Sequence, residues 1–508
     1  MLNWVGLASK IPTVEKSALK LTFREKAKWT LIILVSFFLL GSITIWGINP
    51  EAVAQFEFLE IVFGSRFGSI ITLGIGPIVT ASIILQLLVG SKIIGWDLGN
   101  EEDKKKFAAA QKILTVVFCF ITAVAYVFAG AVPPASGDPF LIIIVILELA
   151  AGGLIIMFMD EVVSKWGFGS GVSLFIAAGV SKTIFLRIFS PPIRGVGGGA
   201  IAAFISGLDQ GLIGQAFTSV LPLIATLIVF VIVVYAQDIR VEIPMSFAMP
   251  FGKFAARRWP LKFLYTSNIP VILIAAVIAN MQVIGRVLYQ RGINFLGVYD
   301  ANGRPISGLM YFLTAPSLGQ TPSALTIVII TIIAAITALV FSLIVFKKWK
   351  RYTRRMFLLG AVIGIAIGTI LAISFNLPVI TSMDAIRVLI YMSVFVIGSM
   401  IFSLFWVNTS GMDAKSVADQ FKASSIVIPG FRRDPRTIEG ILNKYIPALT
   451  VMGGAFIGFL AAFADLTSAI GTGTGILLTV MIIYQLYEQI SAQHYEDMPP
   501  FLRKFIGE

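Results

Sequence analysis

The chain contains very little cysteine, histidine or charge, and each shortage excludes a class of site. Its 508 residues include one cysteine, Cys119, and one histidine, His494. One cysteine cannot form a disulfide within the chain. Metal sites built on several His and Cys ligands, Cys–His nucleophiles and a Ser–His–Asp triad are nearly excluded as well. We therefore expect no catalytic residues, no metal site and no cofactor.

Charged residues make up only 13% of the chain, whereas hydrophobic residues make up 57%. A soluble domain carries about 25% charged residues. The composition is therefore typical of a protein that lies in a bilayer. No stretch is long and polar enough to fold as a separate soluble core. The sequence thus predicts one all-α polytopic membrane domain.

Several apolar runs reach the length of about 20 residues that a membrane-crossing helix needs. The twelve candidates are 28–48, 70–91, 109–131, 139–159, 170–189, 217–237, 263–287, 323–346, 357–375, 385–407, 445–466 and 473–490. The acidic, amphipathic segment 51–66 lies between the first two and is too short to cross. It predicts a re-entrant or interfacial half-helix, and an ordinary surface connection is the alternative.

The distribution of Lys and Arg predicts the orientation in the membrane. If the N-terminus lies in the cytosol and the twelve spans alternate, 31 of the 39 basic residues fall on the cytosolic side and 8 on the other. Basic residues collect in cytosolic loops. We therefore expect a cytosolic amphipathic N-terminal segment, residues 1–27, and a cytosolic C-terminal tail, residues 491–508.

Two pairs of segments indicate an internal inverted repeat. Residues 71–87 and 266–279 share a proline that is followed two residues later by a branched aliphatic residue, and GSGVSLF (169–175) resembles GTGILL (473–478). In each pair the two spans cross the membrane in opposite directions. Inverted repeats of this kind place a central pathway at the interface of the two halves.

Several long stretches make the chain similar to the SecY family, the large pore-forming subunits of the Sec protein-conducting channel, and most similar to its archaeal members. The stretches are ITLGIGPIVTASIILQLLVGS (71–91), GSGVSLFIAAGVS (169–181), VVYAQDIRVEIP (233–244), SNIPVILIAA (267–276), FWVNTSGMDAKS (405–416), GFRR (430–433) and GTGILLTV (473–480). The resemblance implies a non-enzymatic channel for unfolded polypeptides that also releases membrane segments sideways into lipid.

The resemblance also implies the architecture and the partners. Family members have ten spans in two halves of five around an hourglass pore, here 28–190 and 191–490. The two additional apolar runs are then a two-span hairpin, 323–375, inserted between the seventh and eighth spans, and the eighth span is 385–407. The implied partners are the small membrane subunits SecE (gamma) and Sec-beta, the ribosome, and unfolded secretory and membrane-protein substrates, in the plasma membrane.

A ring of branched apolar side chains at the waist of such a pore gives ions no ligands and closes the pore by dewetting. By resemblance, the ring positions are Ile75, Val79, Val172, Ile176, Ile272 and Leu478. The first two and the next two are i, i+4 pairs, and each pair shares one helix face. The alternative is that these residues simply face lipid or the protein core, as most apolar residues of a span do.

The resemblance assigns two further elements of the channel. Segment 51–66 matches the plug, with site residues Phe56, Phe58, Leu59, Ile61 and Arg66. At the lateral gate, Thr80 and Asn268 are polar residues on facing helices, where a hydrogen bond is worth about 1 kcal/mol or less. For Asn268 the alternative is an amide that only packs one helix on another.

Two basic tips, 240–262 and 408–444, are expected to bind ribosomes. Their arginines are Arg257, Arg258, Arg432 and Arg433. Arginine contacts to the phosphates of RNA give strong, salt-dependent binding. The alternative explanation is the general excess of basic residues on the cytosolic side, which suffices for most of these charges.

The main rival is a secondary transporter of a small solute, because twelve spans and an inverted repeat suit one equally well. Such transporters place charged groups near the middle of the bilayer. The clearest deep charge is Glu148, within LIIIVILELA. A membrane enzyme is a third class, and the lack of His and Cys chemistry disfavours it.

Overall fold

The structure is a computed structural model of the chain. It describes residues 11–17, 21–48, 68–90, 93–96, 100–128, 130–191, 198–211, 213–248, 254–266, 269–300, 304–315, 382–423, 426–427, 435–466, 469–470 and 473–494. The plug segment 51–66 and the hairpin 323–375 lie outside the described residues.

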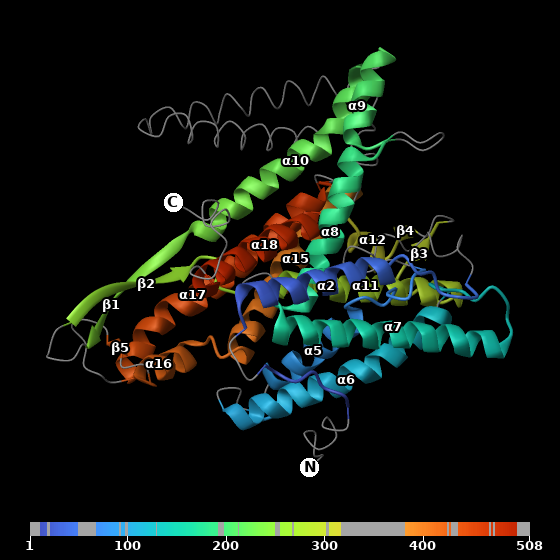
Figure 1. The fold of residues 1–508 in the computed structure, drawn as a ribbon. Helices are drawn as coiled ribbons and strands as arrows, with labels where there is room; N and C mark the ends of the chain where they lie inside the picture. Colours follow the sequence, from blue (N-terminus) through green and yellow to red (C-terminus); the bar gives the residue numbers. More distant parts are fainter. Residues whose placement is uncertain are drawn as a thin grey trace.

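Helices form most of the described structure (Figure 1). Their bounds are α2 Phe23–Leu40, α5 Gly76–Gly90, α6 Glu101–Phe128, α7 Pro139–Trp166, α8 Gly171–Phe189, α9 Ala200–Asp209, α10 Ile213–Asp238, α11 Ile269–Gln290, α12 Leu309–Phe312, α15 Ser382–Thr409, α16 Ala414–Ala423, α17 Pro435–Leu466 and α18 Gly473–His494. Six segments of the described chain are long and apolar enough to cross a membrane. They are Glu101–Phe128, Pro139–Trp166, Gly171–Phe189, Ile269–Tyr289, Ile386–Phe421 and Ile438–Leu466. Helices α5 and α9, and residues Pro222–Asp238 of α10, are apolar but shorter.

Local sequence explains where individual helices begin. The Asp138 carboxylate accepts a hydrogen bond from the Phe140 N–H at 3.1 Å, and Pro139 occupies the first position of α7. At α2, Thr22 and Glu25 form a reciprocal capping box. Such residues satisfy the backbone N–H groups that a helix start leaves without intrahelical partners.

Helix α5 is shorter than the span expected at 70–91. Residues 70–75 form turns, with Gly74 at a φ of 51°, and the regular helix begins only at Gly76. The reason is the glycine-rich sequence TLGIG, since glycine adopts positive φ readily and disfavours a regular helix. The Val79 N–H still donates to the Ile75 carbonyl oxygen at 3.0 Å, so Ile75 lies one turn before Val79.

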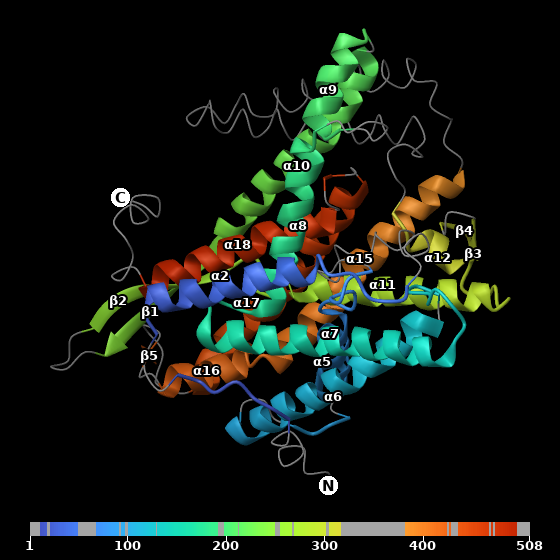
Figure 2. The same ribbon diagram turned by 45° about the vertical axis from the view of Figure 1, so that its right-hand side comes forward.

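The helices pack into one bundle in which segments far apart in the sequence are neighbours. In Figures 1 and 2, α18 lies between α10 and α17, and it also packs against α8. Helix α15 contacts α17, α11 and α5. Contacts between the first and second halves of the chain therefore include those of α5 with α11 and α15 and those of α8 with α9 and α18.

One close approach inside the bundle requires a glycine. A Cβ added at Gly152 of α7 would lie 1.8 Å from the carbonyl oxygen of Ile70. The turn that precedes α5 therefore packs directly on the α7 backbone, and a side chain at this position would push the two segments apart.

We expect Gly152→Ala to lower the free energy of unfolding by about 1–3 kcal/mol, the usual range for overpacking. Thermal unfolding of the purified protein in detergent measures the change. The matched control is Gly440→Ala in α17, where an added Cβ would meet no atom within 4 Å. That substitution should stabilise the helix by about 0.5–1 kcal/mol. Equal midpoints for the wild type and Gly152→Ala would contradict the close approach.

The basic tip 240–262 folds as a β-hairpin rather than as an irregular loop. Strand β1 (Arg240–Ala248) pairs antiparallel with β2 (Phe254–Lys262), and β5 (Ile426–Val427) adds to the other edge of β1 in the order β2-β1-β5. Prolines 244 and 260 hide this pattern in the sequence. The sheet tolerates Pro244 because β5 pairs with β1 only at residues 246 and 247. A second, two-stranded sheet joins β3 (Val298–Tyr299) to β4 (Pro305–Ser307).

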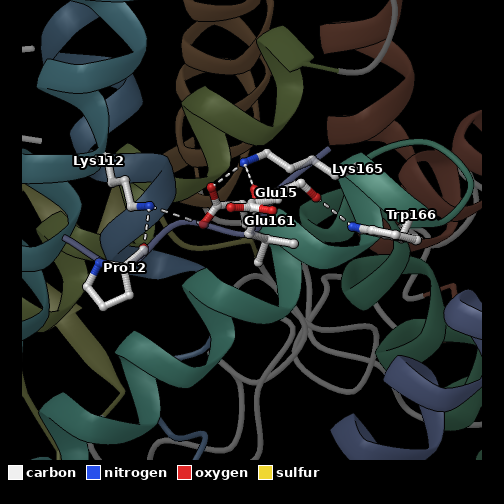
Figure 3. A network of polar contacts seen from close by, with 7 residues as sticks. Pro12, Glu15, Lys112, Glu161, Lys165 and Trp166 are labelled. Carbon is white, nitrogen blue, oxygen red and sulfur yellow. Dashed lines mark hydrogen bonds and ion pairs between the residues drawn. The ribbon is translucent and has the colours of Figure 1, made fainter. Parts of the chain in front are cut away.

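Residues 11–17 form an extended strap across α6 and α7 (Figure 3). The Lys112 ammonium donates to the Pro12 carbonyl oxygen at 2.8 Å, and the Trp166 indole N–H donates to the Glu15 carbonyl oxygen at 2.8 Å. Glu161 pairs with both Lys112, at 3.1 Å, and Lys165, at 2.6 Å. The strap is therefore held through its backbone carbonyls by the Lys112 ammonium and the Trp166 indole, and Glu161 balances the charges of Lys112 and Lys165.

Candidate pore and lateral gate

The six residues predicted for the ring come from four helices of both halves of the chain. Ile75 directly precedes α5 and Val79 lies in its first turn, Val172 and Ile176 lie on α8, Ile272 on α11 and Leu478 on α18. Contacts of α5 with α11, of α8 with α18 and of α11 with α18 bring these helices together. The residues that the repeat pattern paired in sequence are thus part of one neighbourhood in space.

All six belong to, or pack against, the largest apolar cluster of the described residues. Ile75 and Ile176 are each 1% exposed, Val79 and Leu478 each 5%, and Ile272 7%. Val172 is partly buried against the same cluster. Exposures this low mean that these side chains are packed against protein in this structure. The six predicted ring side chains are branched hydrocarbon and carry no group that could replace the hydration shell of an ion.

Polar side chains meet across the neighbouring contact between α5 and α11. The Asn280 amide donates to the Thr80 hydroxyl at 3.3 Å. Asn268, the residue expected to face Thr80, lies outside the described residues. Sequence reasoning missed Asn280, although an amide within the apolar run 269–290 is a signal for polar contact between helices.

Packing along this seam is incomplete on both sides of α15. A cavity of about 260 Å³ lies between α5, α6 and α15, and its polar lining includes Ser82, Gln86 and Gln111. Both glutamine amides donate to the Ser82 hydroxyl at 3.3 Å. An open surface groove of about 420 Å³, almost wholly apolar, lies between Ile274 of α11 and the face of α15 that carries Ile397.

The deep charge Glu148 has a local partner. Its carboxylate accepts a hydrogen bond from the Trp46 backbone N–H at 3.0 Å, in the turn that follows α2. Because Glu148 is anchored to this turn, its position is explained by the fold of the loop and requires no solute or coupling ion.

Several predicted site residues lie where side chains are not described. Two groups of them lie outside the described residues. They are the plug residues Phe56, Phe58, Leu59, Ile61 and Arg66, and the second basic tip's Arg432 and Arg433. Arg257 and Arg258 are placed by the backbone only, on β2 opposite Met245 and Pro244 of β1. The hairpin therefore carries this arginine pair.

Comparison with known proteins agrees with this geometry. A family model described as SecY matches residues 69–487. The protein translocase subunit SecY of Methanothermobacter thermautotrophicus is 41% identical, over 99% of this chain and 98% of the relative. The corresponding subunit of Methanocaldococcus jannaschii is 39% identical over the whole of both chains.

Solved structures show the same fold. The structure of a protein-conducting channel superimposes with a TM-score of 0.76 at 38% identity, over 97% of this chain and 98% of that one. A SecY structure whose plug domain stabilises the closed state and maintains a membrane seal has the same TM-score, identity and coverage of both chains. Sec61 in the canine ribosome–channel complex gives a TM-score of 0.73 at 38% identity, over 97% and 98% of the two chains. The match in sequence and in fold extends over nearly the whole chain, which therefore belongs to the SecY family of pore-forming protein translocase subunits.

Proposed function

We propose that Ile75, Val79, Val172, Ile176, Ile272 and Leu478 form the constriction through which this translocon subunit passes unfolded secretory polypeptides. One observation carries the proposal. Four helices from both halves of the chain contribute these branched aliphatic side chains to one buried cluster. The role is that of a passive conduit and involves no catalytic residue.

A constriction of this kind reconciles two opposing requirements. It must let side chains of any size pass, and it must block ions when no chain is present. Branched hydrocarbon can move aside for a passing chain, whereas the narrow apolar passage dewets when empty and offers ions no ligand. The glycine-rich turn before α5 gives Ile75 a flexible support, which suits a ring that must widen.

The seam between α5 and α6 on one side and α11 and α15 on the other is the proposed lateral gate for membrane segments. A single hydrogen bond between neutral side chains, from Asn280 to Thr80, is described between α5 and α11 at that seam. The apolar groove between Ile274 and α15 leaves space for an apolar segment to enter. An intercalating hydrophobic helix would replace few strong interactions, so the gate can open at low cost.

The remaining architecture follows the family. The proposed channel has halves 28–190 and 191–490, ten core spans, a plug at 51–66 and a peripheral inserted hairpin at 323–375. Both termini are cytosolic, and the protein is a multi-pass component of the plasma membrane. The plug reported for the related SecY structure supports the assignment of 51–66.

The proposed partners are SecE (gamma), Sec-beta and the ribosome. The β1–β2 hairpin projects from the end of α10 and carries Arg257 and Arg258 (Figure 1). A projecting tip with two arginines suits contact with a polyanion such as ribosomal RNA. The related Sec61 structure in a ribosome–channel complex supports the same assignment.

Proteoliposomes distinguish this function from that of a secondary transporter. The purified complex should import a radiolabelled secretory polypeptide and should accumulate no specific solute. The hydrogen bond that anchors Glu148 to Trp46 favours the channel, because this charge already has a structural partner. Solute accumulation without polypeptide import would overturn the proposal.

In the same proteoliposomes we expect Asn280→Leu and Thr80→Val to raise import of a precursor with a weakened signal sequence. A hydrogen bond between membrane helices contributes about 0.6 kcal/mol on average, so its loss should favour the open gate roughly threefold. The matched control is Thr183→Val on α8, whose hydroxyl bonds only to the Gly179 carbonyl oxygen of its own helix. A similar rise in the control, or no rise in either gate variant, would contradict a latch at this contact.

A further inference from the structure

The helix that carries Val172 and Ile176 is capped by a carboxylate from the preceding helix. The N-cap residue of α8, Ser170, makes no side-chain capping bond to the helix. Instead, the Asp160 carboxylate of α7 accepts a hydrogen bond from the Val172 N–H at 2.9 Å. The Gly171 N–H and the Ser170 hydroxyl are also hydrogen-bond donors to this carboxylate. One acidic side chain therefore accepts hydrogen bonds from two of the N–H groups that the start of α8 leaves without intrahelical partners.

The glycine at the start of α8 is what allows this contact. A Cβ added at Gly171 would lie 2.5 Å from the Asp160 Cα atom and 2.8 Å from its carboxylate oxygen. The backbone of α8 thus sits directly on α7 where Asp160 projects. This close approach gives a physical reason for the last glycine of the GSG motif.

Helix α18, which carries Leu478, begins in the same way. The Asp465 carboxylate, near the end of α17, accepts a hydrogen bond from the Thr474 N–H at 3.3 Å. Its second oxygen accepts a hydrogen bond from the Tyr391 hydroxyl of α15 at 2.8 Å. Thr474 and Val172 are both the second residue of their helices. In both halves of the chain, the span before the ring-bearing helix provides the acidic cap.

We propose that Asp160 and Asp465 are a matched pair of positioning residues that hold α8 and α18 in register, so that Val172, Ile176 and Leu478 close the ring. The inference rests on the proposed role of the ring. Val172 itself donates the capping bond, and Ile176 follows one turn later. Leu478 lies one turn after Thr474. A carboxylate is favoured at a helix start by the positive end of the helix dipole, which adds to each hydrogen bond.

The two caps differ in what else they join. The Asp160 carboxylate joins α7 to α8, whereas the Asp465 carboxylate also accepts a hydrogen bond from Tyr391 of α15, the helix beside the proposed gate. Movement of α15 is thereby transmitted to the start of α18. A signal segment that displaces α15 would loosen the ring on this side first.

The test measures ion conductance of the idle, purified translocon in planar bilayers. Asp160→Ala and Asp465→Ala each remove a cap, and each should raise idle conductance roughly 5- to 30-fold, the population change expected for loss of one helix cap. Asp→Asn at either position keeps an acceptor oxygen in place and should raise it less than about threefold, because Asn caps nearly as well as Asp. Asp→Glu keeps the charge but displaces the oxygens, and it should leak as the alanine variant does. If an alanine variant does not assemble, the conductances of the Asp→Asn and Asp→Glu variants at the same position are compared instead.

The matched control is Asp138→Ala, which removes a cap of the same chemistry from α7, a helix without ring residues. Its conductance should equal that of the wild type even if its unfolding midpoint falls. Equal leakage from Asp138→Ala, or no leak from either alanine or glutamate variants that assemble, would overturn the positioning role.

A ring variant run in parallel distinguishes this inference from the proposed function. If the serine-substituted ring conducts ions and the Asp variants do not, the positioning role of Asp160 and Asp465 is wrong and the proposed ring is still supported. If the serine-substituted ring does not conduct ions, the proposed ring is wrong, and this inference loses its basis.

Discussion

Replacing Ile75, Val79 and Ile272 together with serine will make the idle channel conduct ions. These side chains are at most 7% exposed in the closed cluster, and serine would give water polar partners there and reduce the hydrocarbon volume. A dewetted constriction blocks ions only while its lining is apolar and narrow. We expect the conductance of the purified complex in planar bilayers to rise at least tenfold.

A matched set of substitutions shows whether the effect belongs to the ring. Three other branched residues are also fully buried but lie in a separate apolar cluster. They are Val145 and Leu149 of α7, and Val132, which precedes the turn into α7. Their replacement by serine should lower thermal stability without opening a conductance. Equal, near-zero conductance of the wild type and the ring variant would remove these residues from the proposed constriction.

Sequence reasoning succeeded where the signal was an apolar run of regular length. The span expected at 170–189 is the helix Gly171–Phe189, and the one expected at 473–490 begins at the predicted residue. The family assignment was also confirmed, because long stretches such as 71–91 are specific. The two-span hairpin at 323–375 and the total of ten core spans remain predictions.

The boundaries of helices and strands were less predictable where the backbone departs from one continuous membrane-crossing helix. Residues 70–75 are apolar, and hydropathy alone cannot distinguish turns from helix there. Strands β1 and β2 were missed because their basic, proline-containing sequence lacks regular alternation. Their pairing depends on contact between residues up to 22 positions apart, such as Arg240 with Lys262.

Polar contacts between helices were the least predictable feature. The sequence shows Thr80, Asn280, Asp160 and Asp465 as polar residues within apolar runs or at their edges. Their partners are set by how helices pack, which local pattern does not encode. The repeat GSGVSLF and GTGILL pointed to related helix starts, but not to the carboxylates that cap them.

The measurement that tests the central claim most directly is crosslinking of a stalled secretory chain inside the channel. Cys119 is fully buried, and Cys119→Ala gives a background free of cysteine. Single cysteines are then introduced as Ile75→Cys, Ile272→Cys and Ile121→Cys. Ile121 lies on α6 and is 53% exposed, outside the apolar cluster, so it serves as the control.

If the chain passes through the proposed ring, positions 75 and 272 will crosslink strongly to the stalled polypeptide and position 121 will not. Adducts should require a translocating chain and disappear when the chain is released, because the idle ring is closed on itself. A strong adduct at 121 with none at 75 and 272 would show that polypeptides take another path, and it would contradict the account.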